Sequence, residues 1–162
     1  MGAHTAFRRS IQRAKNLLEI HASATAIALT KADGTALHAE ALDDLLRSAV
    51  VLTVSAMDSY FHDRFSEMLV PYLRRHGPNP SLAKHLESCG VNVEFLLQLF
   101  NKKRPLAHVR RKVDQRLFTK PLHSPEEINS LFQKYKVDDL LKAVADARRI
   151  AKKTLKQRLG CR

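Results

Sequence analysis

Two Arg–His pairs are the residues of this chain whose types and spacing could carry out a reaction. Arg104 and His108 have three residues between them, and Arg116 and His123 have six. A histidine can move a proton at the 2′-hydroxyl or the leaving oxygen of RNA, and an arginine can stabilise the charge that develops at phosphorus. Because the chain has 28 Lys and Arg and 8 His, such pairs also arise by chance, and ordinary surface charge is the simpler interpretation of each.

Two charged residues interrupt an otherwise apolar segment. Arg47 and Asp58 are 11 positions apart, close to three helical turns, so in a helix they project on nearly the same side. They could form a polar strip that lines a site. They could equally pair locally, since Asp43 and Asp44 lie four and three positions before Arg47. We favour local pairing.

The positive charge is concentrated late in the chain. Residues 1–100 hold 10 basic and 10 acidic residues, whereas residues 101–162 hold 18 and 6, which accounts for the net charge of +12. Such a block attracts RNA or another polyanion in a salt-sensitive way, although it is also typical of a solubilising surface. Residues 148–162 have no acid, so we expect them to order only on a polyanion. The predicted phosphate-binding residues there are Arg148, Arg149, Lys152, Lys153, Lys156 and Arg158.

Several kinds of chemistry are not supported by the sequence. The histidines and the two cysteines, Cys89 and Cys161, lack metal-ligand spacing, and the five glycines form no phosphate-binding loop, so we expect no metal and no cofactor. Aromatic residues make up 6% of the chain, too few to favour base stacking. We interpret both cysteines as free thiols in a reducing compartment. No apolar stretch reaches the ~18–20 residues that span a bilayer, so we predict a cytoplasmic protein without a membrane partner.

The apolar periodicity predicts an all-α fold, a helical bundle of about five to six helices in a single domain over residues 1–162. The longest helix is expected over 38–75, apolar round most of its circumference and therefore central. Val50–Val54 favours a strand by composition, but helical spacing continues on both sides. Further helices are expected over 5–25, 81–88 and 91–101, with a loop or hairpin over 26–36.

Two later features complete the predicted bundle. Ser124 is followed by proline and then by Glu127, which predicts an N-cap with a capping box, and a final helix follows Asp139.

Apolar residues of the segment 91–101 are predicted to belong to the core: Leu96, Leu97 and Phe100. Residues 102–123 are left without an assigned element.

Two stretches of the chain resemble a known family. The segment 43–63, DDLLRSAVVLTVSAMDSYFHD, carries an Arg, a run of small apolar residues and an acidic-x-Tyr step, and it resembles the second helix of the RiboL-PSP-HEPN group of the HEPN superfamily. The segment 118–128, FTKPLHSPEEI, resembles the start of a later helix of that group. The resemblance covers about residues 38–155 and implies an all-α, usually dimeric bundle. In active members it implies metal-independent ribonuclease activity, often in defence or toxin–antitoxin systems.

The family motif for catalysis is an Arg, four to six residues, and a His, and it normally follows a stretch like Leu155–Leu159. Arg162 lies about where that motif would begin, so we expect a truncated or inactive member. Arg116 and His123 satisfy the spacing and are the catalytic candidates, although Leu117 is apolar where the family has a polar residue. We therefore predict a homodimeric, RNA-associated protein. The alternatives are a module that binds an acidic protein, such as an antitoxin, and, ranked last, a DNA-binding protein.

Overall fold

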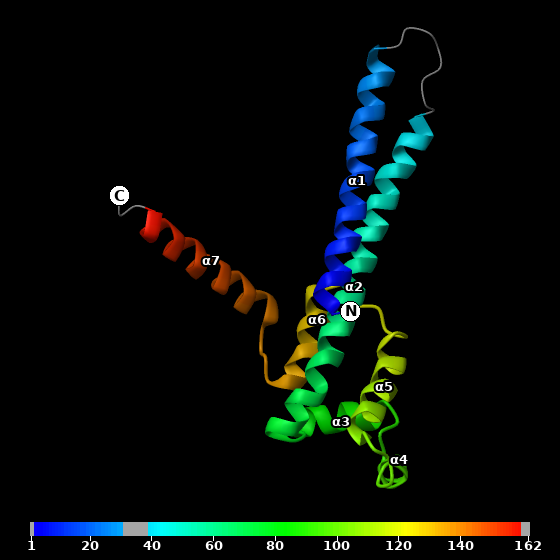
Figure 1. Ribbon diagram of the computed structural model, residues 1–162, viewed down its shortest axis with the longest axis vertical. Coiled ribbons are helices and arrows are strands. Elements are labelled where there is room, and N and C mark those ends of the chain that lie inside the picture. The colour runs from blue at the N-terminus through cyan, green and yellow to red at the C-terminus, as the bar shows by residue number, and fades with distance from the viewer. Residues whose placement is uncertain (1, 31–38, 160–162) are drawn as a thin grey trace. The chain divides into compact units, whose positions relative to one another are not determined.

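The computed structural model describes residues 2–30 and 39–159, with side chains for 2–26 and 40–149, and all regular structure in these ranges is helical (Figure 1). The all-α fold class is confirmed. The described residues form seven α-helices and one 3-10 turn, more than the predicted five to six helices. In chain order these are α1 Ala3–Thr30, α2 Ala39–His76, α3 Pro80–Ser88, α4 Val93–Gln98, α5 Pro105–Leu117, α6 Pro125–Phe132, the turn η1 Gln133–Tyr135, and α7 Leu140–Leu159.

The chain divides into two compact units, Met1–Arg64 and Phe65–Arg162, and α2 passes from the first into the second. Charge follows the same division. The first unit holds 7 basic and 7 acidic residues, and the second holds 21 and 9, so the whole net charge of +12 belongs to the second unit. The single domain over 1–162 stays a prediction.

In the first unit, α1 and the first part of α2 run antiparallel, side by side (Figure 1). The ring of Phe7 lies 4.9 Å from that of Tyr60, and Ala14, Ala49 and Ala56 are buried. The helix continues through the β-favouring segment 50–54, as predicted. The boundary predicted for the first helix is wrong, because α1 continues to Thr30; the rest of the expected loop, residues 31–36, lies outside the described residues.

The prediction that α2 is buried on most sides is wrong for the first unit. Val50 and Val51 are 62% and 66% exposed, and Leu18, Leu46 and Val54 are also exposed. In the first unit α1 covers only one face of α2. Because α2 is apolar round most of its circumference, part of its apolar surface stays exposed. We call the exposed residues Leu18, Leu46, Val50 and Val54 the apolar face of the first unit.

The core of the second unit is an aromatic cluster between the second part of α2 and the segment 132–135. Phe65 is fully buried, and its ring stacks on Tyr135 at 4.5 Å and meets Phe132 edge-on at 6.1 Å. The Tyr135 hydroxyl donates a 2.7 Å hydrogen bond to the Phe65 carbonyl. Burial raises the pKa of Tyr135, so the hydroxyl keeps its proton and remains a donor. This bond fixes η1 against α2 at the centre of the unit.

Side-chain caps set the starts of the short helices. Asn79 and Asn92 accept backbone N–H groups at the first turns of α3 and α4. The predicted capping box is confirmed: Ser124 Oγ accepts from the Glu127 amide, and the Glu127 carboxylate accepts from the amides of Ser124 and His123. These bonds favour the carboxylate and lower the pKa of Glu127. At the other end of this segment Lys136 adopts a left-handed φ of 61°.

One prediction for the segment 91–117 is wrong, and one helix there was not predicted. Leu96, Leu97 and Phe100 are 46%, 60% and 80% exposed instead of buried, because the buried positions of this segment are Val91 and Leu99. Residues 105–117 form α5, a helix that the sequence analysis left unassigned. Its apolar spacing is sparse, with only Val109, Val113 and Leu117 buried among many cations.

Candidate phosphate-binding site

Three cationic side chains from separate parts of the second unit lie within electrostatic range of the C-terminal end of α3. Arg116 lies in the last turn of α5, Lys120 in the turn that follows it, and Lys134 in η1. All three act electrostatically on Cys89, the residue that caps α3. We call Arg116, Lys120 and Lys134 the cation cluster.

The backbone fixes where these side chains begin. The amide of Lys120 donates to the Leu117 carbonyl at 2.9 Å, which closes a turn directly after α5. The Lys134 ammonium donates to the Ser130 carbonyl at 2.9 Å, and the Lys134 carbonyl accepts from Asn79 Nδ2 at 2.7 Å. The cluster is therefore held by turns and a helix end on the folded core.

The charge of the cluster is not balanced locally. Within the described residues no carboxylate forms an ion pair with Arg116, Lys120 or Lys134. Asp114, on the same helix as Arg116, lies 3.8 Å from Arg110 Nε instead. Burial, and then the charge of Lys120, lower the pKa of Lys134. An anion bound among the three would offset both effects, and a phosphate oxygen is suited to accept from Arg and Lys together.

A neutral His–Cys pair lies beneath the cluster. Cys89 Sγ is 3.8 Å from His85 Nε2, four residues earlier in the chain. Burial, with smaller effects of Lys134 and Lys120, lowers the pKa of His85 to about 4. Burial also raises the pKa of the Cys89 thiol, which outweighs the opposing effect of the cations. At neutral pH the pair is thus an uncharged imidazole and a thiol, which is unsuited to thiolate nucleophilic chemistry.

Of the two catalytic candidates, the structure places one in this cluster. Arg116 belongs to it, whereas His123 is exposed in the segment between α5 and α6, where its amide is held by Glu127. In the part of the chain that is described, no hydrogen bond or ion pair joins the Arg116 and His123 side chains. The Arg104 and His108 side chains are also apart. Arg104 is at the N-cap position of α5 and makes no side-chain cap hydrogen bond, and His108 is half-buried within the helix.

The two residues of the predicted polar strip each have a neighbour on α2. Arg47 forms a 3.2 Å ion pair with Asp44, both side chains being largely exposed, so the favoured local pairing of Arg47 is confirmed. The Asp58 carboxylate lies 3.6 Å from Nδ1 of His62, which is buried. A strip formed by Arg47 and Asp58 together stays a prediction.

Comparison of this chain with protein-family models, with curated proteins and with solved structures finds no significant match. The resemblance to the HEPN superfamily therefore stays a prediction. No helix among the described residues has the length and apolar character needed to cross a membrane. The same residues contain no group of three or more His, Cys, Asp or Glu that could hold a metal ion.

The basic residues predicted to bind phosphate late in the chain belong to α7. Arg148 and Arg149 are exposed on this helix. The side chains of Lys152, Lys153, Lys156 and Arg158 lie outside the described residues, although the backbone there is helical. The expectation that this segment orders only on a polyanion is wrong for the backbone up to Leu159.

The sequence predicted Arg116 as a site residue, but not Lys120, Lys134, His85 or Cys89. The spacing of His85 and Cys89, four positions apart before a glycine, is typical of neighbouring side chains in the last turn of a helix. Lys134 carries no such pattern, since it reaches the site only through the packing of the aromatic cluster.

Proposed function

We propose that this protein binds RNA through phosphate contacts at the cation cluster, as a HEPN-like, cytoplasmic homodimer. The observation that supports this is that Arg116, Lys120 and Lys134 all act electrostatically on Cys89, while no carboxylate among the described residues pairs with them. On RNA, the groups that Arg and Lys side chains contact most are the phosphates. Contacts to phosphates position a nucleic acid without reading its sequence.

The proposed binding can be tested with a mixed-sequence RNA and fluorescence anisotropy over a series of salt concentrations. Replacing Arg116, Lys120 or Lys134 by Gln should weaken binding several-fold and reduce the slope of log K against log salt by about 0.7 for each phosphate that the variant no longer binds. Lys142→Gln removes the same charge from an exposed position on α7 and serves as the matched control. Equal losses in the control and cluster variants would mean that only net charge matters, and the site would be discarded.

Catalysis by Arg116 and His123 is the second part of the proposal. His123 would move the proton of the 2′-hydroxyl or leaving oxygen, and Arg116 would stabilise the charge at phosphorus. The assay is RNA cleavage in the presence of a chelator. Cleavage that is lost in His123→Ala but retained in His108→Ala would support the assignment. Cleavage unchanged in His123→Ala would refute it, and no cleavage by the unaltered chain would leave an inactive RNA-binding member.

The apolar face of the first unit supports the homodimer. Val50, Leu46 and Val54 lie on one side of α2 at four-residue steps and are exposed, which is typical of a helix surface that another helix covers. Val50→Asp should convert a dimer into a monomer in light scattering, while Ser48→Asp, an exposed neighbour on α2, should not. A monomeric mass of the unaltered chain at tens of micromolar would rule the dimer out.

The alternative function is a module that binds an acidic protein, such as an antitoxin, through the same net charge of +12 on the second unit. Salt distinguishes the two, because RNA binding that depends on several phosphates falls steeply with ionic strength. A partner interface with an apolar centre would depend on salt much less.

A further inference from the structure

The segment Val93–Phe100, which comprises α4 and the two residues after it, is apolar on both its inner and its outer side. Leu99 is buried, and the ring of Phe95 is half-buried beneath the ammonium of Lys112 at 5.9 Å. The opposite side of the same two turns has no core to cover it. We call its four side chains the apolar stripe: Val93, Leu96, Leu97 and Phe100, exposed by 73%, 46%, 60% and 80%.

The apolar stripe is large for a patch on a surface. Its residues expose roughly 500 Å², which is within the range of the largest apolar patch on a typical monomer, and such patches are often functional. A stable protein–protein interface needs about 800 Å² on each partner, so the stripe alone is too small for one. A few inserted apolar side chains are sufficient, however, for an anchor at a membrane surface when cations lie beside them.

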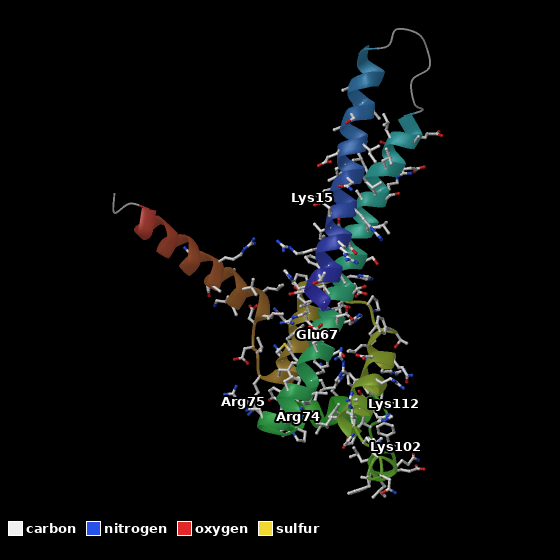
Figure 2. All side chains as sticks on the ribbon, in the orientation of Figure 1. Lys15, Glu67, Arg74, Arg75, Lys102 and Lys112 are labelled. Atoms are coloured by element: carbon white, nitrogen blue, oxygen red, sulfur yellow. The ribbon has the colours of Figure 1, made fainter. Side chains whose placement is uncertain are left out.

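Three consecutive cations adjoin the stripe. Lys102, Lys103 and Arg104 follow Phe100 after a single residue and are all exposed. Figure 2 shows Lys102 beside α4, at the end of the unit where α5 begins. The nearest acidic residue on the helix is Glu94, so this end of the second unit keeps a positive balance.

A pocket of about 350 Å³ extends the apolar surface inward from Leu96. Its walls come from α2, α3, α5 and the segments between them, and among its lining residues only Glu87 carries a charge. The stripe, the pocket mouth and the cations thus form one amphipathic end of the second unit.

We propose that the apolar stripe and the cations 102–104 dock the second unit on the surface of an anionic phospholipid bilayer. Val93, Leu97 and Phe100 would enter the boundary between headgroups and acyl chains, while the cations would contact lipid phosphates and carboxylates. The sequence predicted no membrane partner because no apolar stretch is long enough to span a bilayer, but docking on a bilayer surface does not need such a stretch. This surface and the cation cluster lie at opposite ends of α5, so the inference does not depend on RNA binding.

The test is co-sedimentation of the full chain with vesicles of phosphatidylcholine alone and with vesicles containing about one third phosphatidylserine. Unaltered protein should partition at least tenfold more strongly onto the anionic vesicles. Phe100→Ser should lower that partitioning about tenfold or more, and Lys102→Gln with Lys103→Gln should lower it by a similar factor and only on anionic vesicles. Phe118→Ser, an exposed phenylalanine at the other end of α5, is the matched control.

The proposal fails if the unaltered chain does not bind anionic vesicles. It also fails if Phe100→Ser and Phe118→Ser bind equally. Because Phe100 is exposed, far-UV circular dichroism should show unchanged helix content in its variant. RNA binding measured on the same Phe100→Ser protein should be unaffected, which separates failure here from failure of the proposed RNA site.

Discussion

The half-buried imidazole of His85 predicts how the second unit responds to acid. Its pKa is lowered from 6.5 to about 4, first by burial and then by Lys134 and Lys120. Between these values the unfolded chain binds a proton that the folded chain does not, so the free energy of unfolding falls as the pH falls, by up to about 1.4 kcal/mol per pH unit. The contribution of neutral His85 to stability is fully present above the pKa of this group in the unfolded chain. It is lost progressively as the pH falls to the pKa in the folded chain.

The magnitude follows from the width of that interval. A full loss between pH 6.5 and about 4 would be about 3 kcal/mol, but part of the ring is exposed and water weakens the effect of both lysines. We therefore expect about 2 kcal/mol to be specific to His85. The variant His85→Gln keeps a polar side chain of similar size and removes the titration.

The assay is urea unfolding followed by far-UV circular dichroism at a series of pH values from about 7 to about 4. The measured quantity is the difference between the unaltered chain and His85→Gln at each pH, since all other titrating groups are common to both. His123→Gln, which changes an exposed histidine, is the matched control. If the stability of His85→Gln has the same pH dependence as that of the unaltered chain, the imidazole is not held neutral by burial.

Three further substitutions test the contacts that hold the fold. Tyr135→Phe removes the hydrogen bond to the Phe65 carbonyl and should lower the free energy of unfolding by about 1 kcal/mol in urea titration. Ser124→Ala removes the N-cap of α6 and should cost about 1 kcal/mol by the same measurement, with less helix signal on heating. Arg47→Ala breaks only an exposed pair with Asp44 and should leave the urea midpoint unchanged within error.

Helices with strong local signals were predictable from the sequence. The capping box at Ser124 and Glu127 is a pair of contacts within four residues, so spacing alone is sufficient to predict it. The helix α5 was missed because its apolar positions Val109, Val113 and Leu117 repeat only every fourth residue among cations, a pattern that also fits a basic loop. The exposure of Phe100 could not be predicted, since apolar character does not reveal whether anything packs against it.

The candidate site was predictable only in part. Arg116 was identified through its spacing from His123, yet the structure brings it near Lys120 and Lys134 instead. Lys134 reaches the cluster because Tyr135 is held against Phe65, 70 residues earlier in the chain. Contacts over that separation depend on how helices pack, and no short motif encodes them.

The length of α5 has a consequence for how two anionic ligands would influence each other. The cations 102–104 lie before the first turn of α5, and Arg116 lies in its last turn. With a rise of about 1.5 Å per residue, the helix separates the two groups by about 18 Å along its axis. At physiological ionic strength the Debye length is about 8 Å, so charge neutralised at one end changes the potential at the other very little. The affinity of the protein for RNA should then be the same with and without a bound bilayer. In dilute buffer of about 0.01 M the Debye length grows to about 30 Å, and each ligand should weaken the other measurably.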